Sequence, residues 1–213
     1  MKHFLSVMFL SLLALAPAAL AQRWDVGVGG GGSFYTSQTV QNPLGNASGS
    51  LSDGVAVSAW LGNNINNLFG GELRYDYEQT NLQLSSGGTS TSFGAHTNAV
   101  HYDFVLHFAP SESKVRPFVA AGGGVKAYAG TGTEQAFQPL SNIALLTKTN
   151  DVKALVSVGG GVKFSLAKSV ALRLEVHDYL TPFPTNVIAP ALGSKVGGWL
   201  SDIVVMAGLS FAF

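Results

Sequence analysis

The sequence predicts an all-β protein, a single eight-stranded antiparallel up-and-down β-barrel that crosses a membrane. Three observations lead to this prediction. The chain begins with the pattern of an export signal. Apolar and polar residues then alternate along most of its length. The end of the chain, Gly208–Phe213, is an alternating segment that closes on a phenylalanine. Alternation with a period of two residues is typical of strands that have two different faces.

Residues 1–21 have the pattern of a secretory signal peptide. The start is positively charged at Lys2, the run from Phe4 to Leu15 is almost wholly apolar, and Ala19-Leu20-Ala21 matches a small-x-small cleavage pattern. We therefore expect residues 1–21 to be removed and residues 22–213 to form one outer-membrane barrel domain.

Composition excludes several classes of function. Charged residues make up 11% of the chain, against about 25% in an ordinary soluble domain. Cysteine is absent and the formal net charge is zero, so neither disulfides nor an electrostatic case for nucleic-acid binding arises. Gly27, Gly29 and Gly32 have a dinucleotide-loop spacing, but a strand end follows them instead of a helix. We expect no cofactor.

The mature chain contains eight segments in which apolar and polar residues alternate. The connections between these segments are long and short in turn. Each segment has about ten or more residues, as a tilted membrane strand requires. The predicted segments are 23–36, 53–62, 69–81, 96–108, 116–129, 151–164, 169–180 and 200–213. The long connections are 37–52, 82–95, 130–150 and 181–199, and the short ones are 63–68, 109–115 and 165–168. This alternation places both termini and the short turns in the periplasm, and the long loops outside the cell.

The charges indicate which face of the strands points inward. In the third segment Glu72, Arg74 and Asp76 share one face, and Leu73 and Tyr75 share the other. A soluble lipocalin-like barrel would have the opposite polarity, apolar inside and polar outside. The polar face carries seven acids and five bases, close to the balance that a closed interior needs once a histidine or two is charged. The predicted lumen ion-pair network consists of Glu72, Arg74, Asp76, Asp103, Lys126, Lys153, Lys163, Arg173 and Glu175.

Three stretches carry a resemblance to a known family: Arg116–Val125, Ala154–Phe164 and Ala207–Phe213. With the export signal, they make the mature chain similar to the small eight-stranded outer-membrane barrels, the family of the transmembrane domain of outer-membrane protein A. The resemblance implies a location in the bacterial outer membrane and contact with its lipids. It also implies that Leu209, Phe211 and Phe213 form the signal read by the barrel-assembly machinery.

Two constellations have residue types that are found in catalytic or metal sites. His101, Asp103 and His107 share a strand face, but about 3.3 Å per residue puts the first and last about 20 Å apart. No single ion joins both histidines, so a metal would need ligands from neighbouring strands. The alternative is that they are hydrogen-bonded histidines of a polar interior.

Ser157, Glu175 and His177 are the residue types of a hydrolase triad. They point into the predicted lumen, where a lipid substrate has poor access, and no G-x-S-x-G motif marks a poised serine. We expect no catalytic residue and no metal site.

The third and fourth long loops, 130–150 and 181–199, contain apolar stretches at Ile143–Leu146 and Val187–Leu192. Exposed apolar loop segments mark contacts with a partner or ligand. The alternative is that the two stretches pack on each other or extend the barrel wall. The sequence leaves both interpretations open.

An eight-stranded barrel is just wide enough for its own side chains, so a general diffusion pore is not expected. The favoured function is a non-enzymatic outer-membrane protein that contributes to membrane integrity, or to surface contact through its extracellular loops. One alternative is passage of small apolar solutes through the barrel or a side opening. A second is a lipid-modifying hydrolase.

Overall fold

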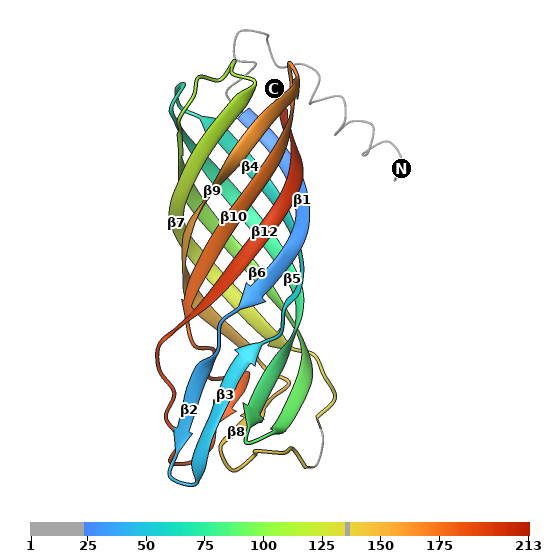
Figure 1. Cartoon of the computed structure of the whole chain (residues 1–213), viewed down its shortest axis with the longest axis vertical. Helices are drawn as coiled ribbons and strands as arrows, with labels where there is room; N and C mark the ends of the chain where they lie inside the picture. Colours follow the sequence, from blue (N-terminus) through green and yellow to red (C-terminus); the bar gives the residue numbers. More distant parts are fainter. Residues whose placement is uncertain (1–23, 135–136) are drawn as a thin grey trace, which may run out of the picture.

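A computed structural model describes residues 24–134 and 137–213 of the chain. Its main feature is a closed ring of eight long antiparallel strands (Figure 1). These strands are β1 (Trp24–Tyr35), β4 (Gly54–Asn64), β5 (Phe69–Ser86), β6 (Thr89–His107), β7 (Val115–Gly130), β9 (Asn150–Ala167), β10 (Val170–Pro182) and β12 (Trp199–Ala212). Each pairs with its neighbours in sequence order, and β1 closes the ring by pairing with both β4 and β12. The predicted eight-stranded up-and-down barrel is confirmed. The predicted signal peptide lies outside the described residues.

Four short strands lie beyond one end of the ring, in the long connections. They are β2 (Gln38–Asn42), β3 (Gly45–Leu51), β8 (Ala144–Leu146) and β11 (Ile188–Pro190). The β2–β3 hairpin is joined to the barrel where β3 pairs with the far end of β5. The strands β8 and β11 pair with each other and tie the third long connection to the fourth.

The second long connection was predicted to span residues 82–95, and this boundary is wrong. The strands β5 and β6 continue to Ser86 and from Thr89, so only a two-residue turn separates them. Gly87 and Gly88 have φ angles of 55° and 83°, the left-handed conformation that tight hairpin turns need. The prediction missed the extension because the inward face of the strand changes within it from charged to apolar side chains.

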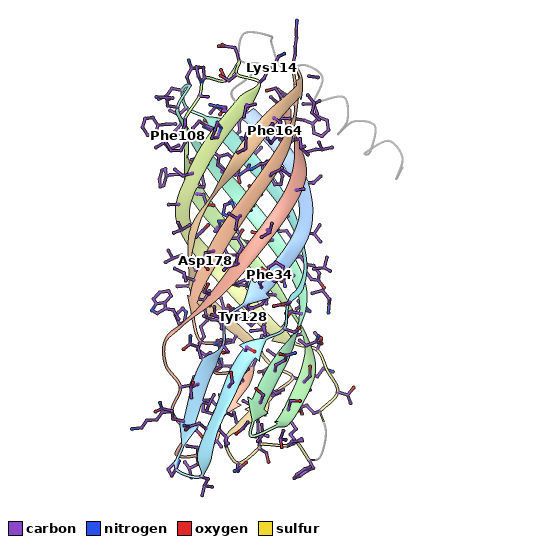
Figure 2. The ribbon with its side chains drawn as sticks, in the orientation of Figure 1. Phe34, Phe108, Lys114, Tyr128, Phe164 and Asp178 are labelled. Carbon is purple, nitrogen blue, oxygen red and sulfur yellow. The ribbon has the colours of Figure 1, made fainter. Side chains whose placement is uncertain are left out.

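The half of the ring nearest the short turns has apolar side chains outside. Leu73 and Tyr75 of β5 expose 49% and 45% of their surface, whereas Arg74 between them is buried. Aromatic side chains on the outer surface lie at two levels (Figure 2): Phe108 and Phe164 near one end of the barrel and Phe34 nearer the other. Apolar surface flanked by aromatic girdles is the pattern of a barrel wall in lipid. Within the described residues, no helix is long and apolar enough to cross a membrane.

Beyond this half, the strands and loops form a cap with its own apolar core. We define the cap as β2, β3, β8, β11, the ends of β5 and β6 from residue 80 to residue 95, and the loops that join them. Its core contains Val40, Ala47, Leu51, Leu82, Leu84, Phe93, Ala95, Tyr128, Ile143, Ala144, Leu146, Phe183, Val187, Ile188 and Leu200. The outward residues of β5 beside this core are polar, as in a sheet that faces water, so the core lies outside the lipid.

Candidate functional site: the barrel interior and its cap

Four charged side chains cross the barrel at its centre. Glu72 and Arg74 come from β5, and Arg173 and Glu175 come from β10. These strands are four places apart in the eight-strand ring, so they face each other across the lumen. Arg74 contacts Glu72 at 2.9 Å and Glu175 at 2.7 Å, and Arg173 contacts Glu175 at 2.6 Å and pairs with Glu72. All four side chains are buried, where water is scarce. Each charge is balanced by an opposite charge instead of by water.

Trp60 of β4 packs against the two guanidinium groups of this quartet. Its ring lies 5.1 Å from Arg74 Cζ and 4.8 Å from Arg173 Cζ, within range of cation–π attraction. The indole rests on glycines of the neighbouring strands: a Cβ atom added at Gly27 would lie 2.3 Å from it, and one at Gly208 would lie 2.6 Å from it. Glycine at these positions therefore makes room for the largest side chain in the lumen.

A second layer links carboxylates through histidine. The two ring nitrogens of His101 each lie 3.0 Å from a carboxylate oxygen, one on Asp76 and one on Asp103. The Tyr179 hydroxyl donates to Asp76 at 3.1 Å. His107 lies apart from this layer, beside Phe118. In the described part of the chain, no group of three or more His, Cys, Asp or Glu residues is arranged to hold a metal ion.

The three triad residue types do meet in this layer. Ser157 Oγ is 3.4 Å from His177 Nδ1, and His177 Nε2 is 3.5 Å from a Glu175 oxygen. The serine hydroxyl is also 3.2 Å from Asp103 and donates to it. Ser157 and His177 expose 0% and 1% of their surface. A nucleophile must also be reached by its substrate, and this serine is fully buried beneath the side chains of the lumen.

A third layer lies where the lumen meets the cap. Lys126 of β7 contacts Glu78 of β5 at 2.8 Å and also pairs with Asp202 of β12. The Tyr35 hydroxyl donates to Glu78. The rings of Tyr35 and Tyr179 lie 5.0 Å and 5.5 Å from the ammonium nitrogen. One lysine therefore joins three strands of the ring beneath the apolar core.

Two lysines of the predicted network lie away from its centre. Lys163 of β9 contacts Asp25 of β1 at 3.0 Å, at the end of the barrel that carries the short turns. Lys153 is partly exposed at the opposite end of β9 and contacts Asp151, its neighbour on the same strand, at 3.1 Å. The ion pairs of the nine predicted residues therefore form separate groups instead of one cluster.

The nine-residue network left out side chains that complete it, although three of them were already counted among the seven acids of the polar face. Asp25, Glu78 and Asp202 lie on the inward face, and they bind the lysines. His101, His177 and Tyr179 connect the acids, and Trp60 covers the arginines. For the residues on β5, β6 and β10 the available signal was their strand position, because they sit in the same alternating register as the charges already assigned to the lumen. Trp60 lies on β4, which carries no charged residue.

The apolar stretches of the third and fourth loops pack on each other. Ile188 pairs in register with Leu146, and both side chains are almost fully buried. Ile143 and Val187 belong to the same core. For most of these residues the structure therefore supports packing of the two stretches on each other, and not contact with a partner. Leu145 and Leu192 are exceptions, because their side chains are 40% and 103% exposed.

The closed ring, the lipid-type outer surface and the filled polar interior define a small outer-membrane β-barrel protein. The chain belongs to the family described as the outer membrane protein beta-barrel domain, which it matches over residues 5–211. It is accordingly a protein of the bacterial outer membrane.

Two solved structures share the fold. Neisserial surface protein A is 13% identical, with a TM-score of 0.55, over 89% of this chain and 97% of that one. The outer membrane protein OprG of Pseudomonas aeruginosa is 12% identical, with a TM-score of 0.56, over 91% of this chain and 97% of that one. No curated protein matches the sequence. At these identities the likeness extends to the fold alone.

Proposed function

We propose that this protein is a non-enzymatic barrel that stabilises the outer membrane and makes surface contacts through its cap. The observation that carries the proposal is the quartet of Glu72, Arg74, Arg173 and Glu175, which spans the lumen between opposite strands. Above it the lysine layer and the apolar core fill the path toward the outside. A lumen filled in this way supports the barrel and opposes the flow of water and ions through the described part of the chain.

Conductance in planar bilayers tests the filled lumen. The unaltered protein should insert and give no steady current, because its charges are paired across the barrel. A large steady current would contradict the proposal and favour passage of solutes. A change in the mass of lipid A upon expression would instead favour the lipid-modifying alternative, which the buried Ser157 argues against.

The cap is the part of the protein that offers a surface for contact. Leu44, Phe137 and Leu192 expose 77%, 76% and 103% of their surface, although most apolar residues around them are buried in the core. Exposed apolar side chains on an otherwise polar loop surface favour contact with a partner. Loops 130–150 and 181–199 supply two of the three.

Replacing Phe137 and Leu192 together by serine tests this surface. Binding of whole cells to other cells and to abiotic surfaces should fall, while the barrel keeps its urea midpoint, since neither side chain belongs to the core. Leu146→Ser is the matched control, because it disrupts the core and lowers stability. Unchanged binding by the double variant would exclude these two side chains as the contact.

Assembly is a separate part of the proposal. Leu209 and Phe211 lie on the outer face of β12 and are 39% and 48% exposed, and Phe213 follows them. We propose that these three residues are read by the barrel-assembly machinery. Phe213→Ala should then leave more protein in the periplasm and less in the outer membrane, whereas Phe108→Ala, another exposed aromatic, should not. A normal outer-membrane yield of Phe213→Ala would contradict this role.

A further inference from the structure

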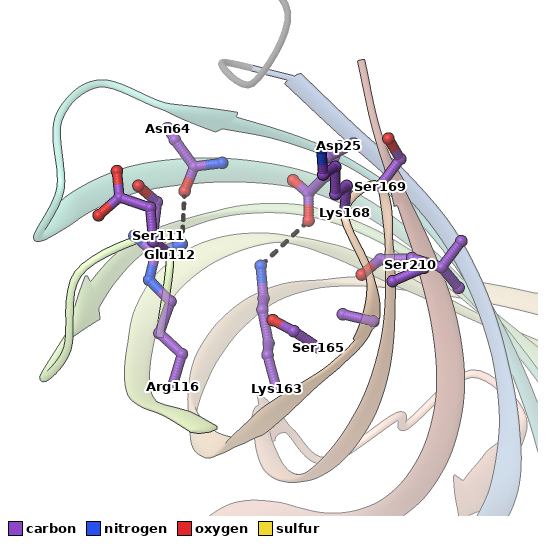
Figure 3. Close-up of a pocket in the computed structure, with 14 residues that line it drawn as sticks. Asp25, Asn64, Ser111, Glu112, Arg116, Lys163, Ser165, Lys168, Ser169 and Ser210 are labelled. Atoms are coloured by element: carbon purple, nitrogen blue, oxygen red, sulfur yellow. Dashed lines mark hydrogen bonds and ion pairs between the residues drawn. The ribbon is translucent and has the colours of Figure 1, made fainter. Parts of the chain in front are cut away.

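The barrel is hollow at the end that carries the short turns. A pocket of about 450 Å³ opens there between the ends of β1, β4, β7, β9, β10 and β12. Figure 3 shows Asp25, Arg116 and Lys163 around it. Ligand pockets in proteins typically measure about 300–1,000 Å³. The space is therefore large enough for a small molecule on the periplasmic side.

Arg116 is a buried cation in this pocket without an anionic partner. It is 6% exposed and donates to three neutral groups: Ala109 O at 3.1 Å, Asn64 Oδ1 at 3.1 Å and Asn67 O at 2.8 Å. All twelve Asp and Glu residues of the sequence lie in the described ranges, and none of them forms a salt bridge with Arg116. A guanidinium has five N–H donors, so two remain available.

The other charges of the pocket do not balance Arg116. Lys163 uses one of its three donors on Asp25, at 3.0 Å. Lys168 and Glu112 also line the pocket, so it contains three cations and two carboxylates. A buried charge without a counter-ion is costly, and a bound anion would remove that cost.

A second buried group near Arg116 also lacks a partner. His107 is 2% exposed, and within the described ranges neither of its ring nitrogens has a hydrogen-bond partner. It is the register partner of Phe118, the next inward residue of β7 after Arg116. Buried polar groups are normally hydrogen-bonded to protein or to water. His107 does not itself line the pocket, but it shows that the lumen next to Arg116 has hydrogen-bonding capacity that the described residues do not use.

We propose that this periplasmic pocket binds a phosphoryl group, with Arg116 and Lys163 as its charged ligands. A phosphate carries one to two negative charges and several acceptor oxygens, which matches the excess cation and the free N–H donors. Serine hydroxyls on the wall, including those of Ser169 and Ser210, supply further donors. The proposal does not rest on the surface-contact function, because it concerns the opposite end of the barrel.

A fixed negative charge in the pocket gives the sharpest test. Ser169 lines the pocket from an exposed turn, so Ser169→Glu introduces a carboxylate there and Ser169→Gln is the matched neutral control. Binding of inorganic phosphate is measured by calorimetry on protein in detergent free of phospholipid. The unaltered protein and Ser169→Gln should bind phosphate saturably, and Ser169→Glu should raise the dissociation constant at least about tenfold.

Arg116→Gln provides a second variant, which should also raise the dissociation constant at least about tenfold. Because Arg116 holds neighbouring turns, its urea unfolding is recorded beside the binding. Two results would overturn the proposal: absence of saturable phosphate binding by the unaltered protein, or equal binding by Ser169→Glu and Ser169→Gln.

The phosphoryl group has two possible sources, a phospholipid headgroup or a soluble periplasmic compound. The same titration in nanodiscs separates them. Every phospholipid carries a phosphodiester, so the reference is the protein in phospholipid-free detergent. If phosphate binding by the unaltered protein and by Ser169→Gln is weaker in phospholipid nanodiscs than in detergent, the headgroup occupies the pocket. If phosphate binds equally in detergent and in nanodiscs, the natural ligand is soluble.

Discussion

The strand β5 passes through two regions that use its faces in opposite ways. In the membrane half its inward residues are Glu72, Arg74 and Asp76, and its outward residues include Leu73 and Tyr75. In the cap the inward residues are Leu82 and Leu84, and the outward ones are Gln83 and Ser85. The alternation keeps its phase throughout, but the polarity of the faces reverses. The strand β6 changes in the same way, from inward His101 and Asp103 to inward Phe93 and Ala95.

The comparison shows that the surroundings decide which face is apolar. In lipid the outer face must be apolar, and the polar side chains are left to pair with one another inside. In water the outer face is polar, and burying the apolar face stabilises the fold. The reversal of polarity along one strand therefore marks where the barrel leaves the membrane, between Tyr77 and Leu82.

Removing a charge from the quartet should have the largest effect. Arg173→Ala leaves Glu72 and Glu175 short of a buried partner, which should cost about 3–5 kcal/mol of unfolding free energy. Urea unfolding in lipid vesicles measures it. Lys153→Ala is the control, because its pair with Asp151 is partly exposed and should contribute less than about 1 kcal/mol. Equal effects of the two substitutions would show that the lumen charges are solvated.

Truncating the cap core should have the next largest effect. Leu84 is fully buried, so Leu84→Ala should cost about 2–5 kcal/mol. Because the cap is outside the lipid, the loss should appear as early protease cleavage of the cap while the membrane half keeps its strand content. Limited proteolysis with circular dichroism measures both. Loss of the whole barrel at the same urea concentration would show that cap and barrel unfold together.

A charge on the outer face tests the polarity reversal directly. Leu174→Arg places a charge on the lipid side of β10 and should cost about 2–4 kcal/mol near the membrane midplane. Gln83→Arg places the same charge on the outer face of β5 in the cap, and it should be nearly neutral. Folding yield and urea midpoints in vesicles compare them. A harmless Leu174→Arg would refute the assignment of the lipid face.

The turn between β5 and β6 should give the smallest effect. Gly87 has a positive φ and open space around it, so Gly87→Ala should cost about 1–2 kcal/mol through backbone strain alone. Gly197 also has open space around a Cβ, without a positive φ, and Gly197→Ala should have little effect. Thermal unfolding of the cap, followed by protease sensitivity, distinguishes the two. Equal midpoints would argue against strain in the hairpin.

Sequence alone determined the ring of strands and the inward face of the membrane half. Period-two alternation is a local property of the backbone, and it can be read wherever one face is charged and the other apolar, as at Glu72 to Tyr77. It also placed the nine lumen residues on their strands. The same method missed the hairpin at Gly87, because the alternation there has the polarity of a soluble sheet.

Tertiary structure alone decided which side chains meet. Arg173 and Glu72 are 101 residues apart, and they pair because ring closure sets β10 opposite β5. Likewise Ile188 covers Leu146 only because two loops are joined above the lumen. Such contacts depend on the order of strands around the ring and on their register. Local alternation does not encode the distance across the barrel, so the partners in the lumen and in the cap appear only once the ring has closed.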